Sequence, residues 1–149
     1  MSLNILFLNG PNLNLLGQRE QSQYGSKNYK YLTEICNKRA KELNLNLDIR
    51  QSNVEGEIVN LIQESVNVYD GIIINAAAYS HTSVAIRDVL DVFKKPKIEV
   101  HISNIYKREE FRHKSLISGV VSGGIFGLGA EGYILAIISL QKTLQNENR

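Results

Sequence analysis

The stretch Ile5-Leu6-Phe7-Leu8-Asn9-Gly10-Pro11-Asn12 decides the fold, because an apolar run ends there abruptly in turn-forming and amide residues. A continuous apolar run is typical of a strand that is buried on both faces, since a strand with one wet face alternates apolar and polar residues. Strands of this kind belong to parallel sheets that helices cover on each side. The stretch therefore predicts the first strand of a three-layered α/β protein.

Outward from this run, short strand-like runs alternate with longer runs of helical periodicity. Further strands are expected at 45–49, 72–75, 98–102 and 116–121. Helices are expected at about 32–43, 58–65, 82–93 and 130–144, with Thr82 or Ser83 as an N-cap and a frayed tail from Gln145. Strands that alternate with helices pair through right-handed crossovers. The pattern predicts a flavodoxin-like, doubly wound sheet of five parallel strands.

Length and composition narrow the class of protein. The 149 residues fit a single domain, expected to cover residues 1–149. The formal net charge of +2 is too small to predict nucleic-acid binding, and no apolar run approaches the ~20 residues that cross a bilayer. No signal peptide is recognisable, and the single cysteine, Cys36, excludes an intrachain disulfide. We therefore expect a cytoplasmic protein that binds neither nucleic acid nor membrane.

Polar residues follow three of the expected strands, at 9–12, 75–77 and 101–104. Ligands of doubly wound sheets bind beyond the carboxyl ends of the strands, so these segments are expected to form the site. Groups there that suit the hydroxyls and carboxylate of a small anion are Asn12, Asn75, His81, Ser103 and Arg112. No nucleophile stands beside a base, and the set favours acid–base chemistry.

Two side chains are candidates for proton transfer. Glu99 and His101 lie two apart on an expected strand, so they point to the same face, where a carboxylate would orient the imidazole as a general acid. The polar, glycine-flanked loop at about 17–25 could act as a lid. It carries Tyr24 and Arg19, and a guanidinium favours the phenolate that a tyrosine needs to act as a base. The alternatives are a buried structural pair and an ordinary loop tyrosine.

Three further signals have ordinary structural explanations. Residues 127–132 match G-x-G-x-x-G, but no strand follows the helix that they open, so a tight turn is expected in place of a dinucleotide site. His81, His101 and His113 match no common zinc spacing, and we expect neither a metal nor a cofactor. The basic run 106–114 either forms a solvated surface or binds an anion.

The stretches that hold these residues resemble type II 3-dehydroquinate dehydratase. The matching stretches are 9–17, 19–20, 24–25, 51–53, 55–57, 70–75, 85–88, 99–105, 108–113, 127–129 and 132–133. They run in order over nearly the whole chain, and several are distinctive motifs. The resemblance implies a flavodoxin-like hydro-lyase that converts 3-dehydroquinate to 3-dehydroshikimate by anti elimination through an enolate. It implies no metal or cofactor, and a place in the shikimate pathway or in quinate breakdown.

The resemblance also implies roles for individual residues. Tyr24 would take the proton from the carbon next to the ketone, and Arg19 would hold Tyr24 as a phenolate. Arg108 would add positive potential, and Asn12 would hold a water that stabilises the enolate.

The departing hydroxyl would receive its proton from His101, supported by Glu99. The residues that would hold the substrate are Asn75, His81, Asp88 and Arg112, with backbone groups of Ile102 and Ser103. By the same resemblance, the chain would assemble into a dodecamer, a tetramer of trimers.

Three residues depart from the pattern of the family, and none is a proposed catalytic group. Val54 stands where a histidine is expected, Ala76 where a proline commonly follows the asparagine, and Ser80 where threonine is usual. Ala76 would loosen the loop that carries Asn75 and His81, because proline restricts the chain. Two other interpretations stay open: a flavin- or nucleotide-binding module on the same fold, and a scaffold without activity.

Overall fold

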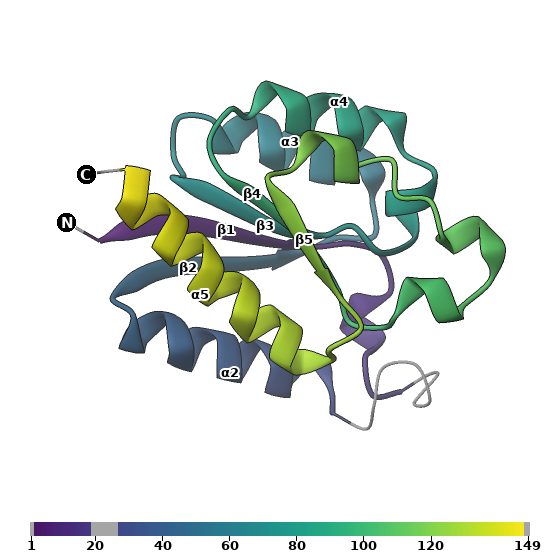
Figure 1. The fold of residues 1–149 in the computed structure, drawn as a ribbon, viewed down its shortest axis with the longest axis horizontal. Helices are drawn as coiled ribbons and strands as arrows, with labels where there is room; N and C mark the ends of the chain where they lie inside the picture. The colour runs from purple at the N-terminus through teal and green to yellow at the C-terminus, as the bar shows by residue number, and fades with distance from the viewer. Residues whose placement is uncertain (1, 19–26, 148–149) are drawn as a thin grey trace.

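A computed structural model describes residues 2–18 and 27–147 and contains a five-stranded sheet. The strands lie in the order β2-β1-β3-β4-β5, and every neighbouring pair is parallel. Their bounds are Leu3–Asn9 (β1), Leu45–Gln51 (β2), Gly71–Asn75 (β3), Lys97–His101 (β4) and Gly123–Phe126 (β5). Figure 1 shows the five strands at the centre of the molecule. The predicted flavodoxin-like parallel sheet is confirmed.

Helices cover both faces of the sheet (Figure 1). One face is covered by α2 (Tyr29–Glu42) and α5 (Ala130–Glu147), the other by α3 (Glu55–Ser65) and α4 (Val84–Val92). Short 3-10 helices follow several strands: η1 (Leu13–Leu15), η2 (Ala77–His81), η3 (Ile105–Lys107), η4 (Glu110–Arg112) and η5 (Ser118–Val120). The helices of the described ranges include none with the length and apolar character needed to span a membrane.

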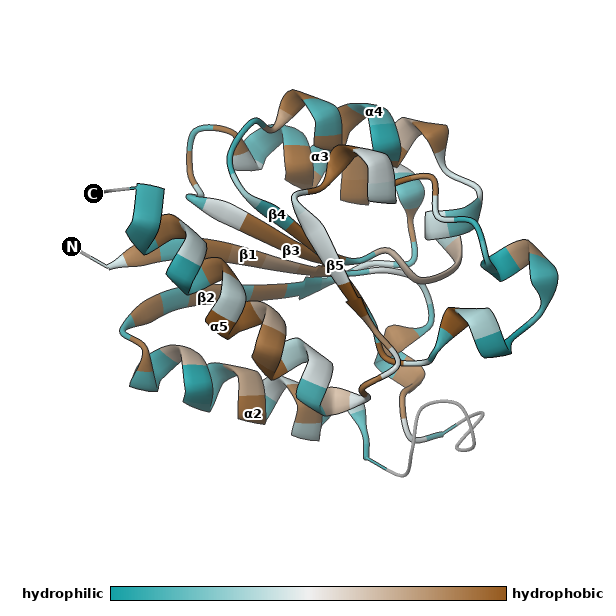
Figure 2. Ribbon diagram, viewed as in Figure 1, coloured by the Kyte–Doolittle hydropathy of each residue, from teal (hydrophilic) through white to brown (hydrophobic). Residues whose placement is uncertain are grey.

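The first strand separates two hydrophobic clusters. Ile5 and Phe7 pack into the cluster beneath α2 and α5, whereas Leu6 and Leu8 pack into the cluster beneath α3 and α4. Each of the four side chains is 0 or 1% exposed, and burying one such side chain favours folding by about 1.5–3 kcal/mol. Figure 2 shows hydrophobic residues along the central strands and on the helices that face them. The opening apolar run is therefore the doubly buried strand that its composition predicts.

Two predicted boundaries in the C-terminal part of the chain were wrong. The fifth strand lies at Gly123–Phe126, and residues 116–121 instead form a loop with η5. Ile117 is apolar because it anchors this loop in the cluster beneath α3 and α4. The real strand begins with two glycines and pairs with β4 through its backbone, so it lacks the apolar pattern of a strand. Helix α5 continues to Glu147, so residues 145–147 are helical and not frayed.

Residues 127–132 form the tight turn expected between the last strand and the last helix. Gly127 and Gly129 have φ angles of 84° and 63°, the left-handed region that favours glycine. Their backbone N–H groups donate to the carbonyls of His101 and Ile102, at 3.2 and 3.0 Å. The turn therefore ties the start of α5 to the end of β4.

A buried lysine closes the end of α4 and supports a first prediction. Lys97 is 7% exposed, and its Nζ donates to the carbonyls of Leu90 and Phe93 at 2.7 and 2.5 Å. Lys97→Met is expected to lower the free energy of unfolding by about 1–3 kcal/mol, because both carbonyls lose a charged donor. Urea titration measures the loss. Lys95→Met is the control: its ammonium bonds two carbonyls at an exposed position, where water can replace it.

Candidate active site

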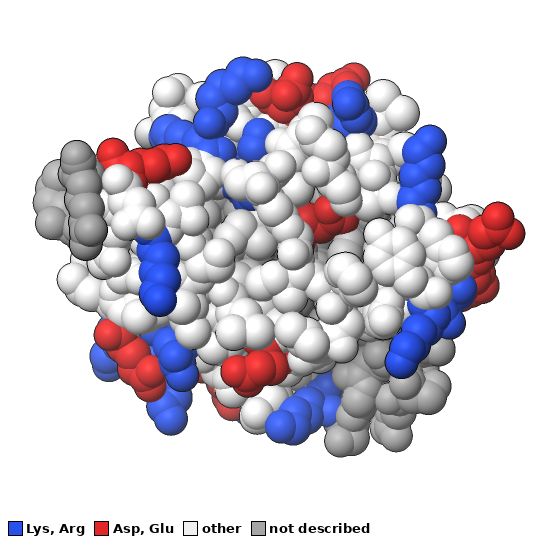
Figure 3. Space-filling view, viewed as in Figure 1, with Lys and Arg blue, Asp and Glu red and all other residues white. Residues whose placement is uncertain are grey.

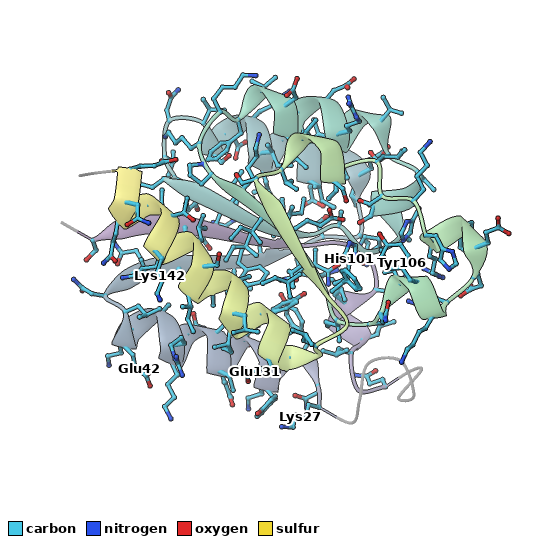
Figure 4. All side chains as sticks on the ribbon, viewed as in Figure 1. Lys27, Glu42, His101, Tyr106, Glu131 and Lys142 are labelled. Atoms are coloured by element: carbon cyan, nitrogen blue, oxygen red, sulfur yellow. The ribbon has the colours of Figure 1, made fainter. Side chains whose placement is uncertain are left out.

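A pocket opens beyond the carboxyl ends of β1, β3 and β4, where the sequence predicted the site. Its lining consists of Pro11, Asn12, Leu13, Leu16, Asn75, Ala77, Ala78, His81, His101, Ile102, Ser103, Ile105, Arg108 and Arg112. Figure 4 labels His101, the last residue of β4, beside the ribbon of β5. The polar groups stand against an apolar wall of leucine, isoleucine and alanine, of which sequence reasoning named only Ile102 as a site residue. A site of this composition suits a small polar ligand whose position a few groups define.

Most of the predicted site residues meet in this pocket. The lining includes Asn12, Asn75, His81, His101, Ile102, Ser103, Arg108 and Arg112. Glu99 lies directly behind the ring of His101. Arg19 and Tyr24 lie outside the described residues, as do residues 19–25 of the proposed lid.

Asp88 does not line the pocket of this chain. It lies on α4 with 68% of its side chain exposed, and its nearest charged partner is Arg87, whose Nη1 is 3.8 Å from Oδ1. Asp88 lies on the exposed side of α4, so its carboxylate is in solvent and not in the pocket. His113 is also absent from the lining. Within ranges 2–18 and 27–147, no three histidine, cysteine or acidic side chains gather in a way that could hold a metal ion.

Glu99 and His101 form a buried pair at the end of β4, as their spacing predicted. They are 4% and 7% exposed, and Nε2 of the imidazole lies 2.5 Å from Oε2 of the carboxylate. Because a carboxylate accepts hydrogen bonds, Nε2 is the donor. The contact fixes the orientation of the ring and leaves Nδ1 as the nitrogen that can exchange a proton with a ligand.

Two serines complete the surroundings of Glu99. Ser115 Oγ donates to Oε2 at 2.6 Å, and Ser118 Oγ donates to Oε1 at 2.5 Å. Burial alone would raise the pKa of Glu99, but the hydrogen bond and charge of His101, together with the two serine bonds, outweigh it and hold that pKa below its ordinary value. Glu99 is thus ionised at neutral pH. Sequence reasoning missed both serines, because they lie in or beside the segment expected to be a strand.

His81 faces the same pocket from η2. The carbonyl of Lys114 lies 2.8 Å from Nδ1, and since a carbonyl only accepts, Nδ1 carries the proton of the neutral ring. Burial lowers the pKa of His81, and the charges of His101 and Arg112 lower it further. The hydrogen bond to the carbonyl of Lys114 raises the pKa but does not outweigh them. Its ring centroid lies 6.4 Å from that of His101. At neutral pH, Nε2 of His81 is therefore an acceptor suited to a hydroxyl.

A buried hydrogen-bond relay holds Asn75 at the floor of the pocket. Its Oδ1 accepts from the backbone N–H of Ala77 at 3.0 Å, and its Nδ2 donates to the Tyr133 hydroxyl at 3.0 Å. That hydroxyl donates in turn to Oδ1 of Asn9 at 2.5 Å. An amide nitrogen has two N–H groups, so the relay fixes the orientation of the amide and leaves one donor for a ligand. Sequence reasoning did not find the parts played by Asn9 and Tyr133.

Two arginines give the pocket a positive side. Only 6% of the Arg108 side chain and 20% of the Arg112 side chain are exposed. Nη1 of Arg108 donates to Ser103 Oγ at 3.5 Å, and Nε of Arg112 donates to Glu109 Oε1 at 3.2 Å. In a partly dry pocket, guanidinium groups attract a carboxylate strongly. The basic run 106–114 therefore contributes two residues to an anion-binding wall.

The departures from the family pattern leave the pocket lining intact. Val54 is 56% exposed and precedes α3, away from the lining residues. Ala76 is fully buried behind the pocket with a φ of −74°, close to the angle that a proline would impose. Its carbonyl accepts from Tyr79 N at 3.1 Å, and Ser80 O accepts from Leu116 N at 2.7 Å. These bonds anchor the loop that carries His81, and a loosening effect of Ala76 stays a prediction.

Close backbone contact between the first and third strand ends supports a second prediction. The N–H of Gly10 donates to Asn75 O at 2.7 Å, and a Cβ at position 10 would lie only 2.4 Å from the carbonyl oxygen of Ala76. Gly10→Ala is expected to cost about 3 kcal/mol and to lower Tm by roughly 10 °C, because one of two backbones must move. Calorimetry measures the shift. Gly56→Ala is the control, since nothing lies within 4 Å of its added Cβ.

Comparison with known proteins identifies the family. The family model described as dehydroquinase class II matches residues 3–141. A 3-dehydroquinate dehydratase from Acaryochloris marina is 50% identical over 144 residues, covering 97% of each chain, and one from Caldicellulosiruptor saccharolyticus is 53% identical over 94% of this chain and 97% of its own. The crystal structure of the type II dehydroquinase from Butyrivibrio crossotus matches with a TM-score of 0.92 and 50% identity, over 93% of this chain and 97% of that one. This chain therefore belongs to the class II dehydroquinase family.

Proposed function

We propose that this chain dehydrates 3-dehydroquinate to 3-dehydroshikimate by anti elimination through an enolate, as a hydro-lyase of the shikimate pathway. The observation that carries the proposal is the buried Glu99–His101 pair, 2.5 Å apart, at the wall of a pocket that also holds two arginines. The pair supplies an oriented proton donor, and the arginines supply a binding site for the carboxylate of the substrate. Relatives about 50% identical over most of the chain bear the name 3-dehydroquinate dehydratase.

The elimination needs a base, a stabilised enolate and an acid. In the proposed course, Tyr24 removes the proton next to the ketone and Arg19 holds Tyr24 as a phenolate. Negative charge then develops on the ketone oxygen, where Asn12 holds a stabilising water and Arg108 adds positive potential. The carbon–oxygen bond breaks as Nδ1 of His101 gives its proton to the departing hydroxyl, which leaves as water.

The remaining polar groups hold the substrate in place. The neutral ring of His81 accepts from a ring hydroxyl, and the fixed amide of Asn75 donates to a ring oxygen. The backbone of Ile102 and Ser103 assists, and Arg112 forms the clamp for the carboxylate. Every group acts through hydrogen bonds and charge, so the protein positions and polarises the substrate without covalent contact.

We further propose that copies of the chain assemble into the dodecamer that the family resemblance implies. Exposed apolar side chains at Tyr106, Phe126, Leu128 and Leu135 support self-association, and Figure 3 shows a largely uncharged surface over β5 and the middle of α5. Asp88 stays a predicted substrate contact, which its solvent-facing position allows only across an interface between copies. Light scattering on the purified protein tests the assembly. A cytoplasmic location also stays a prediction.

The activity is tested by mixing purified protein with 3-dehydroquinate and following the ultraviolet absorbance of the conjugated enone carboxylate. Parallel reactions contain a metal chelator or borohydride, which would stop a metal-dependent or an imine mechanism. A rise in absorbance that neither reagent abolishes is the expected result. Folded protein that produces no rise from intact substrate would contradict the proposal and favour the scaffold without activity.

A further inference from the structure

Glu99 is a buried carboxylate with donors on both oxygens. Oε2 accepts from His101 Nε2 at 2.5 Å and from Ser115 Oγ at 2.6 Å, and Oε1 accepts from Ser118 Oγ at 2.5 Å. The residue is 4% exposed, and a carboxylate withdrawn from water stays ionised only where hydrogen bonds or opposite charge replace its hydration. Two of its three described donors come from outside β4, from a loop 16 and 19 residues further along the chain.

This loop is fixed in place by contacts of its own. The backbone N–H of Leu116 donates to Ser80 O at 2.7 Å, which ties the loop to η2. Ile117, between the two serines, is 0% exposed and packs in the cluster beneath α3 and α4. Val120 N donates to Ile117 O at 3.0 Å and closes the turn after Ser118. Ile117 is thus a buried anchor, and the serine hydroxyls on either side of it both donate to the carboxylate of Glu99.

We propose that Ser115 and Ser118 are positioning residues for the elimination, which hold Glu99 ionised and in the single orientation that aligns His101 for proton transfer. The inference rests on the proposed function and extends it to a segment with no predicted role. Neither serine lines the pocket, so each acts through Glu99 and not on the substrate. A carboxylate held at both oxygens cannot rotate away from Nε2 without breaking at least one of these bonds.

Other titratable and charged groups lie on the elements around Glu99. From its own strand, His101 contacts it, and Lys97 lies on the same face two residues earlier. On η2, the pKa of His81 responds to the charge of Glu99 and also to that of Arg112 on η4. On β5, the facing residue is Gly124, which has no side chain. The serines are therefore the neutral donors in this set, and removing them changes no formal charge.

The direction of the expected pKa change follows from the protonation state of Glu99 that the serines bind. Their hydroxyls donate to the ionised carboxylate, so they lower the pKa of Glu99 in the folded protein. A lowered carboxyl pKa stabilises the fold at pH values above the unfolded pKa, and this contribution is lost as the pH falls through the folded pKa. Without the serines, Glu99 takes up a proton at higher pH. A protonated carboxyl accepts the hydrogen bond from Nε2 of His101 more weakly than a carboxylate does, so the hold on the imidazole is reduced.

The test measures kcat against pH for Ser115→Ala, Ser118→Ala and the double variant, with 3-dehydroquinate as substrate. The acidic limb of the profile is expected to move to higher pH in each single variant and further in the double one. At the acid end, kcat of the double variant is expected to fall about tenfold relative to the parent, while KM changes little. Ser118→Thr keeps a hydroxyl at this exposed position, so this variant is expected to have the same dependence of kcat on pH as the parent.

Ser122→Ala is the matched control for loss of a hydroxyl near this strand, since Ser122 Oγ accepts from Lys97 N at 3.0 Å and does not contact Glu99. An equal shift of the acidic limb in this control would overturn the proposal, as would an unshifted profile in a folded double variant. NMR titration of the Glu99 carboxyl carbon gives a second readout. It is expected to report a higher titration midpoint in the double variant.

The carboxyl titration also separates this inference from the proposed function. If the parent protein proves inactive on 3-dehydroquinate, the proposed function fails on its own assay. The midpoint of Glu99 then still decides the inference: a midpoint unchanged by loss of both serines overturns it, and a raised midpoint supports the hold on the carboxylate.

Discussion

His101→Ala is expected to lower kcat by roughly 10²–10⁴-fold, with KM for 3-dehydroquinate within a few-fold of the parent value. The imidazole is buried, aligned by Glu99 at 2.5 Å and placed on the pocket wall, so its loss removes the proton donor for the departing hydroxyl. Water that enters the space is a poorer and less oriented acid. Steady-state kinetics with the absorbance assay measures the change.

The control for this variant is His113→Ala, which removes a histidine from η4's C-cap outside the pocket lining. It is expected to keep kcat near the parent value. Thermal melting of both variants shows whether the fold persists, because the buried Glu99 carboxylate loses its hydrogen bond from Nε2 in His101→Ala. A folded His101→Ala protein with the parent kcat would remove this residue as the acid.

Tyr24→Phe is expected to reduce kcat by a similar roughly 10²–10⁴-fold while the substrate still binds, because the ring loses the oxygen that takes up the proton. Calorimetry measures substrate binding and the absorbance assay measures kcat, so together they separate a loss of turnover from a loss of binding. Tyr106→Phe is the control, since Tyr106 is 53% exposed and absent from the lining of the pocket. Full turnover in Tyr24→Phe would exclude this tyrosine as the base.

Deuterium exchange distinguishes the two variants. In deuterium oxide, a chain that keeps its base but lacks its acid can form the enolate and return it to the ketone with solvent deuterium. The His101→Ala protein is therefore expected to exchange the proton next to the ketone without completing the elimination. The Tyr24→Phe protein is expected to do neither, and exchange by both variants would contradict the assigned roles.

Local sequence patterns predicted the parts of the molecule that local interactions determine. The runs at Leu3–Asn9 and Gly71–Asn75 are apolar because both faces of these strands are buried, so composition alone identifies them. The pair Glu99 and His101 could be predicted because two residues on one strand must share a face. Strand β5 could not be predicted in this way, because two of its four residues are glycines and its pairing with β4 depends on the backbone.

Contacts between distant segments account for what sequence reasoning missed in the site. Ser115 and Ser118 acquire their role only when their loop folds over β4, and no local pattern marks a serine that will meet a buried carboxylate. The relay from Asn9 to Tyr133 joins residues 124 positions apart. The polar strand ends identified the rim of the pocket, whereas the supports behind them depend on the complete tertiary structure.

The same relay makes the floor of the pocket depend on a hydroxyl that is distant in the sequence. Tyr133 lies on α5, and its hydroxyl holds one N–H of Asn75, while the backbone N–H of Ala77 holds the oxygen of the same amide. Without the hydroxyl, the Asn75 side chain keeps the bond from Ala77 but loses the second one, so the N–H that faces a ligand is less firmly aimed. The accuracy with which this end of β3 holds a ligand is therefore set in part by a helix that contributes no residue to the pocket lining.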